Sequence, residues 1–214
     1  MWQWISNNSS ALSVISSFLT FVLWLVYLQM LYQGFKRQRQ PKIIVNRGGG
    51  SDLNARCVIS NMSSESIFIE HLVAALHTDK GVLIKDLTDL GPSRDDDNLD
   101  NWENLNEVTR QGPMLSGSYS HIGSFADTVK TVLQAYDIPA DGPQANDGHQ
   151  LQAIEIRVIA VYGSEDQPVG ASRTFNVVET NEGQALQPAS IETKRYATRW
   201  KRRQVNQWIR DLEH

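Results

Sequence analysis

The chain has 214 residues, a formal net charge of −4 and one cysteine, Cys57. Once an N-terminal apolar segment is set aside, about 150 to 180 residues remain, which is enough for one domain with a real hydrophobic core. A single cysteine excludes an internal disulfide and suits a reducing compartment.

The N-terminal segment gives the strongest signal in the sequence. Residues 11–32 are apolar and carry no charge. A helix of that length is about 33 Å long, enough to cross a hydrocarbon layer of about 30 Å. A cleaved signal peptide fits less well, because no base precedes the run and Leu31-Tyr32-Gln33 is a poor cleavage site. The sequence predicts a transmembrane helix over residues 11–35 after an extracytoplasmic tail, residues 1–10.

Charge on the two sides of this helix predicts its orientation. Residues 1–10 contain no base, whereas five bases follow in a predicted juxtamembrane linker, residues 36–50: Lys36, Arg37, Arg39, Lys42 and Arg47. Basic residues near a helix end stay on the cytoplasmic side of a membrane. We therefore expect a single-pass inner membrane protein with its N-terminus outside and its main domain in the cytoplasm.

Small hydroxyl side chains mark one face of the predicted transmembrane helix. They recur at i, i+3, i+4 and i+7, as Ser13, Ser16, Ser17 and Thr20. Small residues let a second helix backbone approach closely, and their hydroxyls can bond across the contact. The alternative is that they bond to carbonyls of their own helix. The pattern predicts packing against another transmembrane helix or a membrane complex.

After Pro41 the pattern changes to short, alternating apolar runs that are typical of β-strands. The predicted strands are residues 42–46, 55–60, 67–77, 81–87, 113–121, 151–162 and 169–178. Seven short strands favour a mainly β fold, with an antiparallel immunoglobulin-like β-sandwich over residues 51–180. The Cys…Trp…Cys pattern of antibody domains is absent, so this assignment depends on the number of strands.

One helix is expected to interrupt the strands and to cover an open end of the sandwich. Ser124 can cap its N-terminus, and Asp127 lies three residues later, as in a capping box. Its apolar face would consist of Phe125, Val129, Val132, Leu133 and Tyr136.

Residues 188–214 predict a basic amphipathic C-terminal helix. Its apolar arc contains Trp208, and a neighbouring arc is rich in arginine. The helix could dock on the domain itself or a partner protein, or lie on the cytoplasmic leaflet. Nucleic acid is disfavoured, because residues 48–189 hold eight bases against 21 acids. The residues expected to dock on a membrane or partner are Lys36, Arg37, Arg39, Arg199, Arg202, Arg203 and Trp208.

Chemical motifs are weak. In the acidic loop 95–107, five side chains match the spacing of an EF-hand calcium loop, namely Asp96, Asn98, Asp100, Asn104 and Glu107, and the candidate ligands are Asp96, Asn98, Asp100 and Glu107. Asn101 replaces the usual glycine and no amphipathic helices flank the loop, so a solvated loop is the preferred interpretation. The histidines lack HxxxH and HExxH spacing, and no phosphate loop or nucleophile elbow is present. We expect Cys57 in the core and no metal, cofactor or catalytic residue.

The sequence favours a membrane-anchored, non-catalytic interaction, scaffold or accessory protein. Its expected partners are membrane lipid and another transmembrane helix or a membrane complex, bound through loops, a sheet edge and the basic helix. Two alternatives remain. One is an enzyme or metal-dependent sensor that uses residues 95–107 and the histidines. The other is a membrane-surface protein that binds anionic lipid. No specific partner or small-molecule ligand is indicated.

Overall fold

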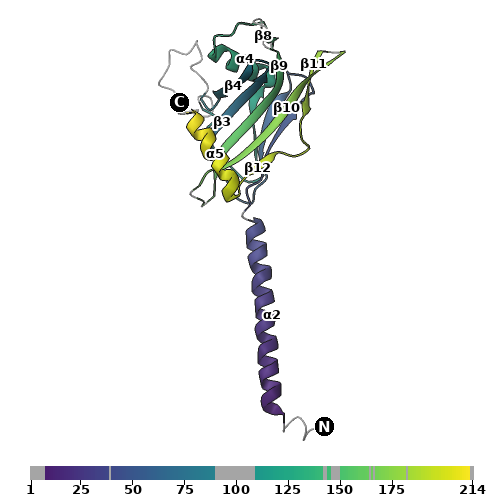
Figure 1. Ribbon diagram of the computed structural model, residues 1–214, viewed down its shortest axis with the longest axis vertical. Coiled ribbons are helices and arrows are strands. Elements are labelled where there is room, and N and C mark those ends of the chain that lie inside the picture. Colours follow the sequence, from purple (N-terminus) through teal and green to yellow (C-terminus); the bar gives the residue numbers. More distant parts are fainter. Residues whose placement is uncertain are drawn as a thin grey trace. The chain divides into compact units, whose positions relative to one another are not determined.

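The computed structural model describes residues 8–38, 40–89, 109–141, 144–145, 150–163, 165, 167–181 and 183–212. The chain divides into two compact units, Met1–Gln40 and Pro41–His214. The first contains an apolar helix, and the second is a mainly β domain with two antiparallel sheets (Figure 1). The described residues contain three helices, labelled α2, α4 and α5. The predicted mainly β architecture between an N-terminal apolar helix and a C-terminal helix is therefore confirmed.

Helix α2 (Ser9–Gln38) forms the first unit. Its segment Ser9–Lys36 contains an 18-residue window with a mean hydropathy of 2.1 and is, among the described residues, the helix long and apolar enough to cross a membrane. The helix continues three residues beyond the predicted end at residue 35. Basic residues at a helix C-terminus are favourable because they complement its partial negative charge, which accounts for the extension through Lys36 and Arg37.

The smaller sheet has the strand order β1-β2-β6, from β1 (Ile43–Gly48), β2 (Arg56–Asn61) and β6 (Tyr119–Ser124). All its pairings are antiparallel, with Ile43 opposite Asn61 and Ile59 opposite Ser120. Side chains alternate between the two faces of a strand. The inward face is apolar and fully buried, with Ile43, Val45, Cys57, Ile59 and Ile122.

The larger sheet has the order β11-β10-β9-β3-β4, with β12 added to β10 and β5 added to β3. Its strands are β3 (Ile67–Thr78), β4 (Gly81–Asp86), β5 (Gly112–Met114), β9 (Leu151–Tyr162), β10 (Val169–Thr180), β11 (Gly183–Pro188) and β12 (Lys194–Tyr196). A separate hairpin joins β7 (Ala140–Asp141) to β8 (Gln144–Ala145).

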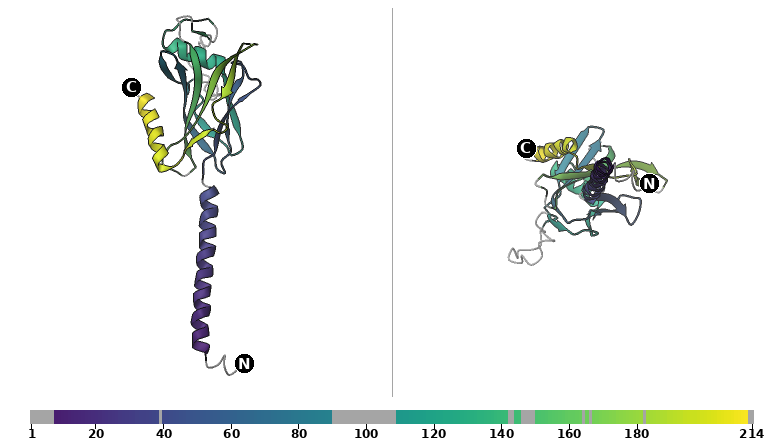
Figure 2. Two further views of the ribbon diagram at one scale, coloured as in Figure 1. Left: turned by 45° about the vertical axis from the view of Figure 1, so that its right-hand side comes forward. Right: turned by 90° about the horizontal axis from the view of Figure 1, so that it is seen from below.

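Helix α4 (Phe125–Ala135) covers one end of the sandwich, as Figures 1 and 2 show. The predicted capping box is present, since the Ser124 side chain accepts from the Asp127 backbone N–H and Asp127 accepts from the Ser124 backbone N–H. Phe125 is fully buried and meets Phe175 of β10 with ring centroids 4.9 Å apart. The buried hydrophobic core residues of the described chain run from Ile43 to Trp208, so residues 41–214 contain a complete core.

Several elements differ from the sequence prediction, and the β7–β8 hairpin is one that was not expected. The strand expected over residues 113–121 is two strands, β5 and β6, which join different sheets. Strand β11 was not expected, because its apolar residues are few. The helix expected from residue 188 begins only at Arg199, because β12 pairs with Gly170–Ser172 of β10. Strand β11 pairs only with Phe175–Thr180 of β10. The earlier stretch Gly170–Ser172 therefore needs a second partner, which is β12.

Candidate functional site

Helix α5 (Arg199–Leu212) lies on the outer face of the larger sheet (Figure 2). Its Val205 and Trp208 form a second apolar cluster with Ile159 of β9, apart from the sandwich core. The helix approaches the sheet closely at Gly170. A Cβ atom there would lie 2.7 Å from Val205 Cγ2 and 3.1 Å from Trp208 Cζ3. The apolar face of α5 is therefore covered by the domain's own sheet.

The Trp208 ring is held by polar as well as apolar neighbours. The Arg157 guanidinium carbon lies 5.1 Å from the centre of the ring, in cation–π geometry. Arg157 in turn donates to Glu155 Oε2 at 2.7 and 3.0 Å. Trp208 is 5% exposed. Its ring is thus an internal contact and is not presented to a membrane or a partner.

The bases of α5 divide into one that is engaged and several that are exposed. Arg202 pairs with Glu165 and donates to the Ala197 carbonyl at 2.8 Å. Arg199, Lys201 and Arg203 are exposed. Of the predicted docking residues in this helix, Arg199 and Arg203 therefore remain at the surface, whereas Arg202 fixes the start of α5 to the β9–β10 turn.

A buried asparagine organises the end of the domain where the chain enters β1. Asn61 is fully buried, and its Nδ2 donates to the carbonyls of Glu65 at 3.0 Å and Met114 at 2.9 Å. Its Oδ1 accepts from the Ser63 backbone N–H at 3.0 Å. Asn61 therefore joins the β2–β3 loop to the segment between β5 and β6. The Met62 backbone N–H donates to the Lys42 carbonyl at 2.8 Å, so all these segments meet beside Lys42.

This end of the domain carries exposed apolar and basic side chains. Tyr119 begins β6 there, and the first turn of α5 is held there by Arg202, which contacts residues 165 and 167 of the β9–β10 turn. We call this surface the Lys42 rim. Its apolar members are Met62, Leu115, Tyr119 and Trp200, and its basic members are Lys42, Arg199, Lys201 and Arg203.

A pocket of about 370 Å³ lies beside β1 and is lined partly by Lys42, Arg173 and Arg195. Arg173 is 8% exposed, and burial lowers the pKa of its guanidinium. It donates to the carbonyls of Val45 at 2.9 Å and Ile191 at 3.1 Å. Its charge therefore ties β1 to the segment between β11 and β12, and the pocket has a structural arginine in its wall.

The edges of the smaller sheet are occupied by side chains. On β1, the Val45 N–H donates to Thr193 Oγ1 at 3.0 Å, and its carbonyl accepts from Arg173. On β6, the Ile122 carbonyl accepts from Arg110 at 3.0 Å. Arg110 also donates to the Leu87 carbonyl at 2.7 Å, and burial lowers its pKa.

The outer strands of the larger sheet are closed in the same way. On β4, the Tyr136 hydroxyl accepts from the Ile84 N–H at 3.1 Å and donates to the Ile84 carbonyl at 3.0 Å. On β11, the Leu186 N–H donates to the Ser51 carbonyl at 2.6 Å, and Arg47 donates to the Leu186 carbonyl. An added strand would have to displace these bonds. These two positions of the edges are therefore occupied, and binding at a sheet edge, which the sequence suggested, stays a prediction.

The residues considered for chemistry are dispersed. Within the described chain no group of three or more His, Cys, Asp or Glu side chains is placed to hold a metal ion. His71 Nδ1 lies 2.8 Å from Asp86 Oδ2, and His77 lies 3.8 Å from Glu155. The acidic loop with Asp96, Asn98, Asp100 and Glu107 lies outside the described residues, as do His149 and His214. Cys57 is fully buried, and burial raises the pKa of its thiol to about 12.

On α2, the hydroxyl residues Ser13, Ser16, Ser17 and Thr20 are all exposed within their unit. The Thr20 hydroxyl donates to the Ser16 carbonyl at 2.8 Å, so this hydroxyl is engaged within its own helix. Lys36 is exposed, the Arg37 side chain is outside the described set, and Arg39 is not described.

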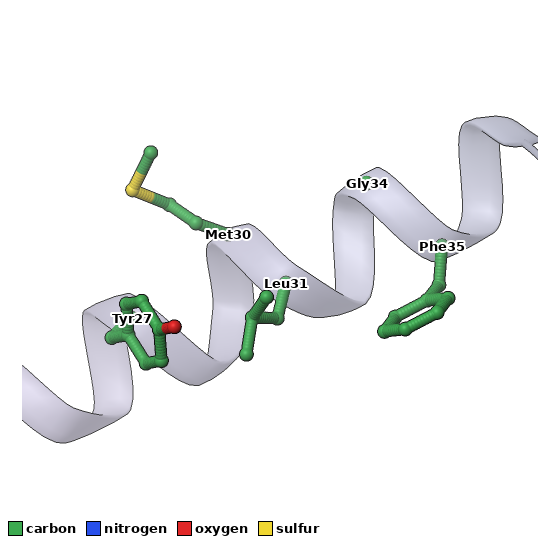
Figure 3. Close-up of a pocket in the computed structure, with 5 residues that line it drawn as sticks. All are labelled: Tyr27, Met30, Leu31, Gly34 and Phe35. Atoms are coloured by element: carbon green, nitrogen blue, oxygen red, sulfur yellow. The ribbon is translucent and has the colours of Figure 1, made fainter.

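A shallow hollow of about 390 Å³ lies near the C-terminal end of α2 (Figure 3). Gly34 has no side chain, so the space beside Met30 on the helix surface is left unfilled. Figure 3 shows Tyr27, Leu31 and Phe35 projecting together from one side of the helix. The hollow is mainly apolar, and the Tyr27 hydroxyl is the polar side-chain group among the residues that line it.

No known protein family, curated protein or solved structure matches this chain. The immunoglobulin-like type of sandwich is therefore not supported by any neighbour, and the architecture rests on the two sheets themselves.

Asn61, Arg173 and Gly170 position these surfaces, and sequence reasoning assigned none of them a role. Tyr136 was predicted on the apolar face of α4, but it is 46% exposed and its hydroxyl binds the β4 edge. A buried asparagine looks like any turn asparagine in the sequence, and the partners of Arg173 and Tyr136 are more than 50 residues away or in a loop. The spacing of the sequence gives no signal for such contacts.

Proposed function

We propose that the protein is a membrane-anchored, non-catalytic interaction protein. Helix α2 spans the membrane with its N-terminus outside, and the sandwich is held at the cytoplasmic face as a scaffold or accessory subunit. The observation that carries this proposal is the exposure of α2 on every side. Every side chain from Ser9 to Lys36 is exposed within its unit, although an 18-residue window of the segment has a mean hydropathy of 2.1. Such a helix needs a lipid environment, because water would wet an apolar surface several turns long.

The domain is self-contained, which supports an interaction role. Its core is complete, its sheet edges carry side-chain bonds, and α5 covers an outer face. The domain therefore does not need a partner in order to fold. Regulated or structural association would then use the surfaces that remain, which are the loops and the face of α2 with Ser13, Ser16, Ser17 and Thr20.

Anchoring is tested by membrane fractionation after an alkaline wash. The full chain should stay in the membrane pellet, and a chain of residues 41–214 should appear in the supernatant as a folded protein. Release of the full chain by the wash would contradict anchoring by α2.

Lateral packing is tested with Ser17→Leu in a membrane-helix association assay. A leucine at a close helix contact should weaken association by about 1 kcal/mol, because the backbones can no longer approach. Val22→Leu is the matched control, since residue 22 lies on nearly the opposite face. Equal association of both variants would remove the hydroxyl face from the proposal.

A further inference from the structure

We propose that the Lys42 rim docks on an anionic lipid leaflet, so that the domain lies against the membrane with this end. The proposal rests on the anchoring of α2 proposed above, and it assigns the rim one occupant, a lipid surface. Three features of the rim support it: its exposed apolar tips, its bases and its place in the chain.

The apolar members stand out from the domain surface. Their side chains are exposed to the extent of 53% for Met62, 67% for Leu115, 73% for Tyr119 and 78% for Trp200. They come from three separate stretches of chain, the β2–β3 loop, the segment from β5 to β6 and the first turn of α5. Tyr and Trp are favoured where one part of a ring is apolar and the other is wet, as at lipid headgroups.

The basic members give the rim a positive charge. Lys42, Arg199, Lys201 and Arg203 are all exposed, and the Arg203 guanidinium lies 4.8 Å from the centre of the Trp200 ring. Among the described residues, two acids lie in the same region. Glu165 is paired with Arg202, and Glu65 is exposed in the β2–β3 loop. Bases at an anionic leaflet are attracted to it over about a Debye length.

The covalent chain limits how far the rim can be from the leaflet. Helix α2 ends at Gln38, and Lys42 belongs to the rim. Four residues of extended chain span at most about 14 Å. If α2 crosses a membrane, the rim is tethered close to the surface from which the helix emerges. The tether raises the effective concentration of the rim at the lipid surface, so even weak contacts to lipid suffice for docking.

The test uses the full chain in lipid nanodiscs, with a spin label at a new cysteine. Leu115→Cys reports on the rim, and Glu179→Cys reports on the far end of β10, where the chain turns into β11. The native Cys57 does not interfere, because it is fully buried and burial raises the pKa of its thiol to about 12. The accessibility of each label to oxygen and to an aqueous nickel complex gives its depth in the bilayer.

In nanodiscs with anionic lipid, the label at position 115 should be shielded from nickel and accessible to oxygen, while the label at position 179 stays aqueous. Replacing Arg199, Lys201 and Arg203 with glutamine should weaken docking by about fivefold per base, the equivalent of about 1 kcal/mol each. A matched variant with Lys85, Lys130 and Arg210 replaced by glutamine has the same charge outside the rim and should dock normally.

The outcomes separate the two proposals. If the full chain does not remain with the nanodiscs, anchoring fails, and the rim proposal fails with it. If the chain is inserted but the label at position 115 is as aqueous as the label at position 179, anchoring stands and lipid docking is overturned. Equal shielding in zwitterionic and anionic nanodiscs would overturn the role of the bases. Shielding that appears only when a partner protein is added would assign the rim to that protein.

Discussion

The rings of Trp208 and Tyr196 meet edge to face, with centroids 4.7 Å apart and an interplanar angle of 68°. This contact joins α5 to β12, the short strand that precedes it. Because Arg157 approaches the same ring, Trp208 is the point at which the C-terminal helix, β12 and β9 are connected. The two tryptophans of α5 therefore have opposite roles, since Trp208 is buried and Trp200 is exposed.

Replacing Trp208 with alanine should destabilise residues 41–214 by about 3 kcal/mol, because a large buried aromatic side chain is lost. Urea denaturation measures this. The matched control is Trp200→Ala in the same helix, which should change stability by less than about 0.5 kcal/mol because the side chain is exposed. Equal effects of the two substitutions would show that α5 does not dock on the sheet.

Asn61→Asp should destabilise the domain by about 3 kcal/mol, because a carboxylate would face the Glu65 and Met114 carbonyls in place of an N–H donor. The control is Asn176→Asp, at an exposed position of β10. Thermal denaturation at neutral pH compares the two variants. An Asn61 variant as stable as the control would contradict the role of this side chain in joining the two loops.

The Cys57 thiol predicts a pH dependence of stability. Its pKa is about 12 in the folded state, whereas the ordinary value of the thiol, which applies to the unfolded chain, is 9.0. Above pH 9 the unfolded chain releases a proton that the folded chain keeps, so the contribution is complete below pH 9 and is lost as the pH rises toward 12. Between pH 8 and 10 the loss should be about 1.4 kcal/mol. Urea titrations of the wild type and of Cys57→Ala measure it, and an identical loss in the alanine variant would contradict this origin.

Tyr136→Phe should open the edge of β4, because the hydroxyl that binds both backbone groups of Ile84 is removed. The expected loss of stability is about 1 kcal/mol. An exposed edge also favours self-association, which sedimentation velocity detects over a range of concentrations. Tyr119→Phe is the control, since that ring lies on the rim. A monomeric Tyr136 variant at all concentrations would mean that the hydroxyl does not protect the edge.

Much of the fold could be predicted from local patterns. The alternation of apolar residues over 151–162 gives the bounds of β9, and the Ser124 and Asp127 pair gives the start of α4. These features depend on neighbours within a few residues, so the sequence carries them directly. The apolar length of α2 is predictable for the same reason.

The candidate surfaces could be predicted only in part. The arginines of α5 are visible in the sequence, but their division into engaged and exposed groups depends on Glu165 and on the turn that it occupies. The predicted start of this helix, residue 188, is too early. Pro188 and Ser190 resemble the start of a helix, which explains the error. The competing demand of β10 for a pairing partner at Gly170–Ser172 is a long-range effect and leaves no local signal.

The central claim is that α2 crosses a membrane and leaves the domain on the cytoplasmic side. Its most direct test is the labelling of Glu179→Cys by a membrane-impermeant maleimide in cells that express the full chain, since Cys57 is buried and does not react. The proposal predicts no labelling in intact cells and full labelling after permeabilisation. Labelling of position 179 in intact cells would place the domain outside and contradict the proposal.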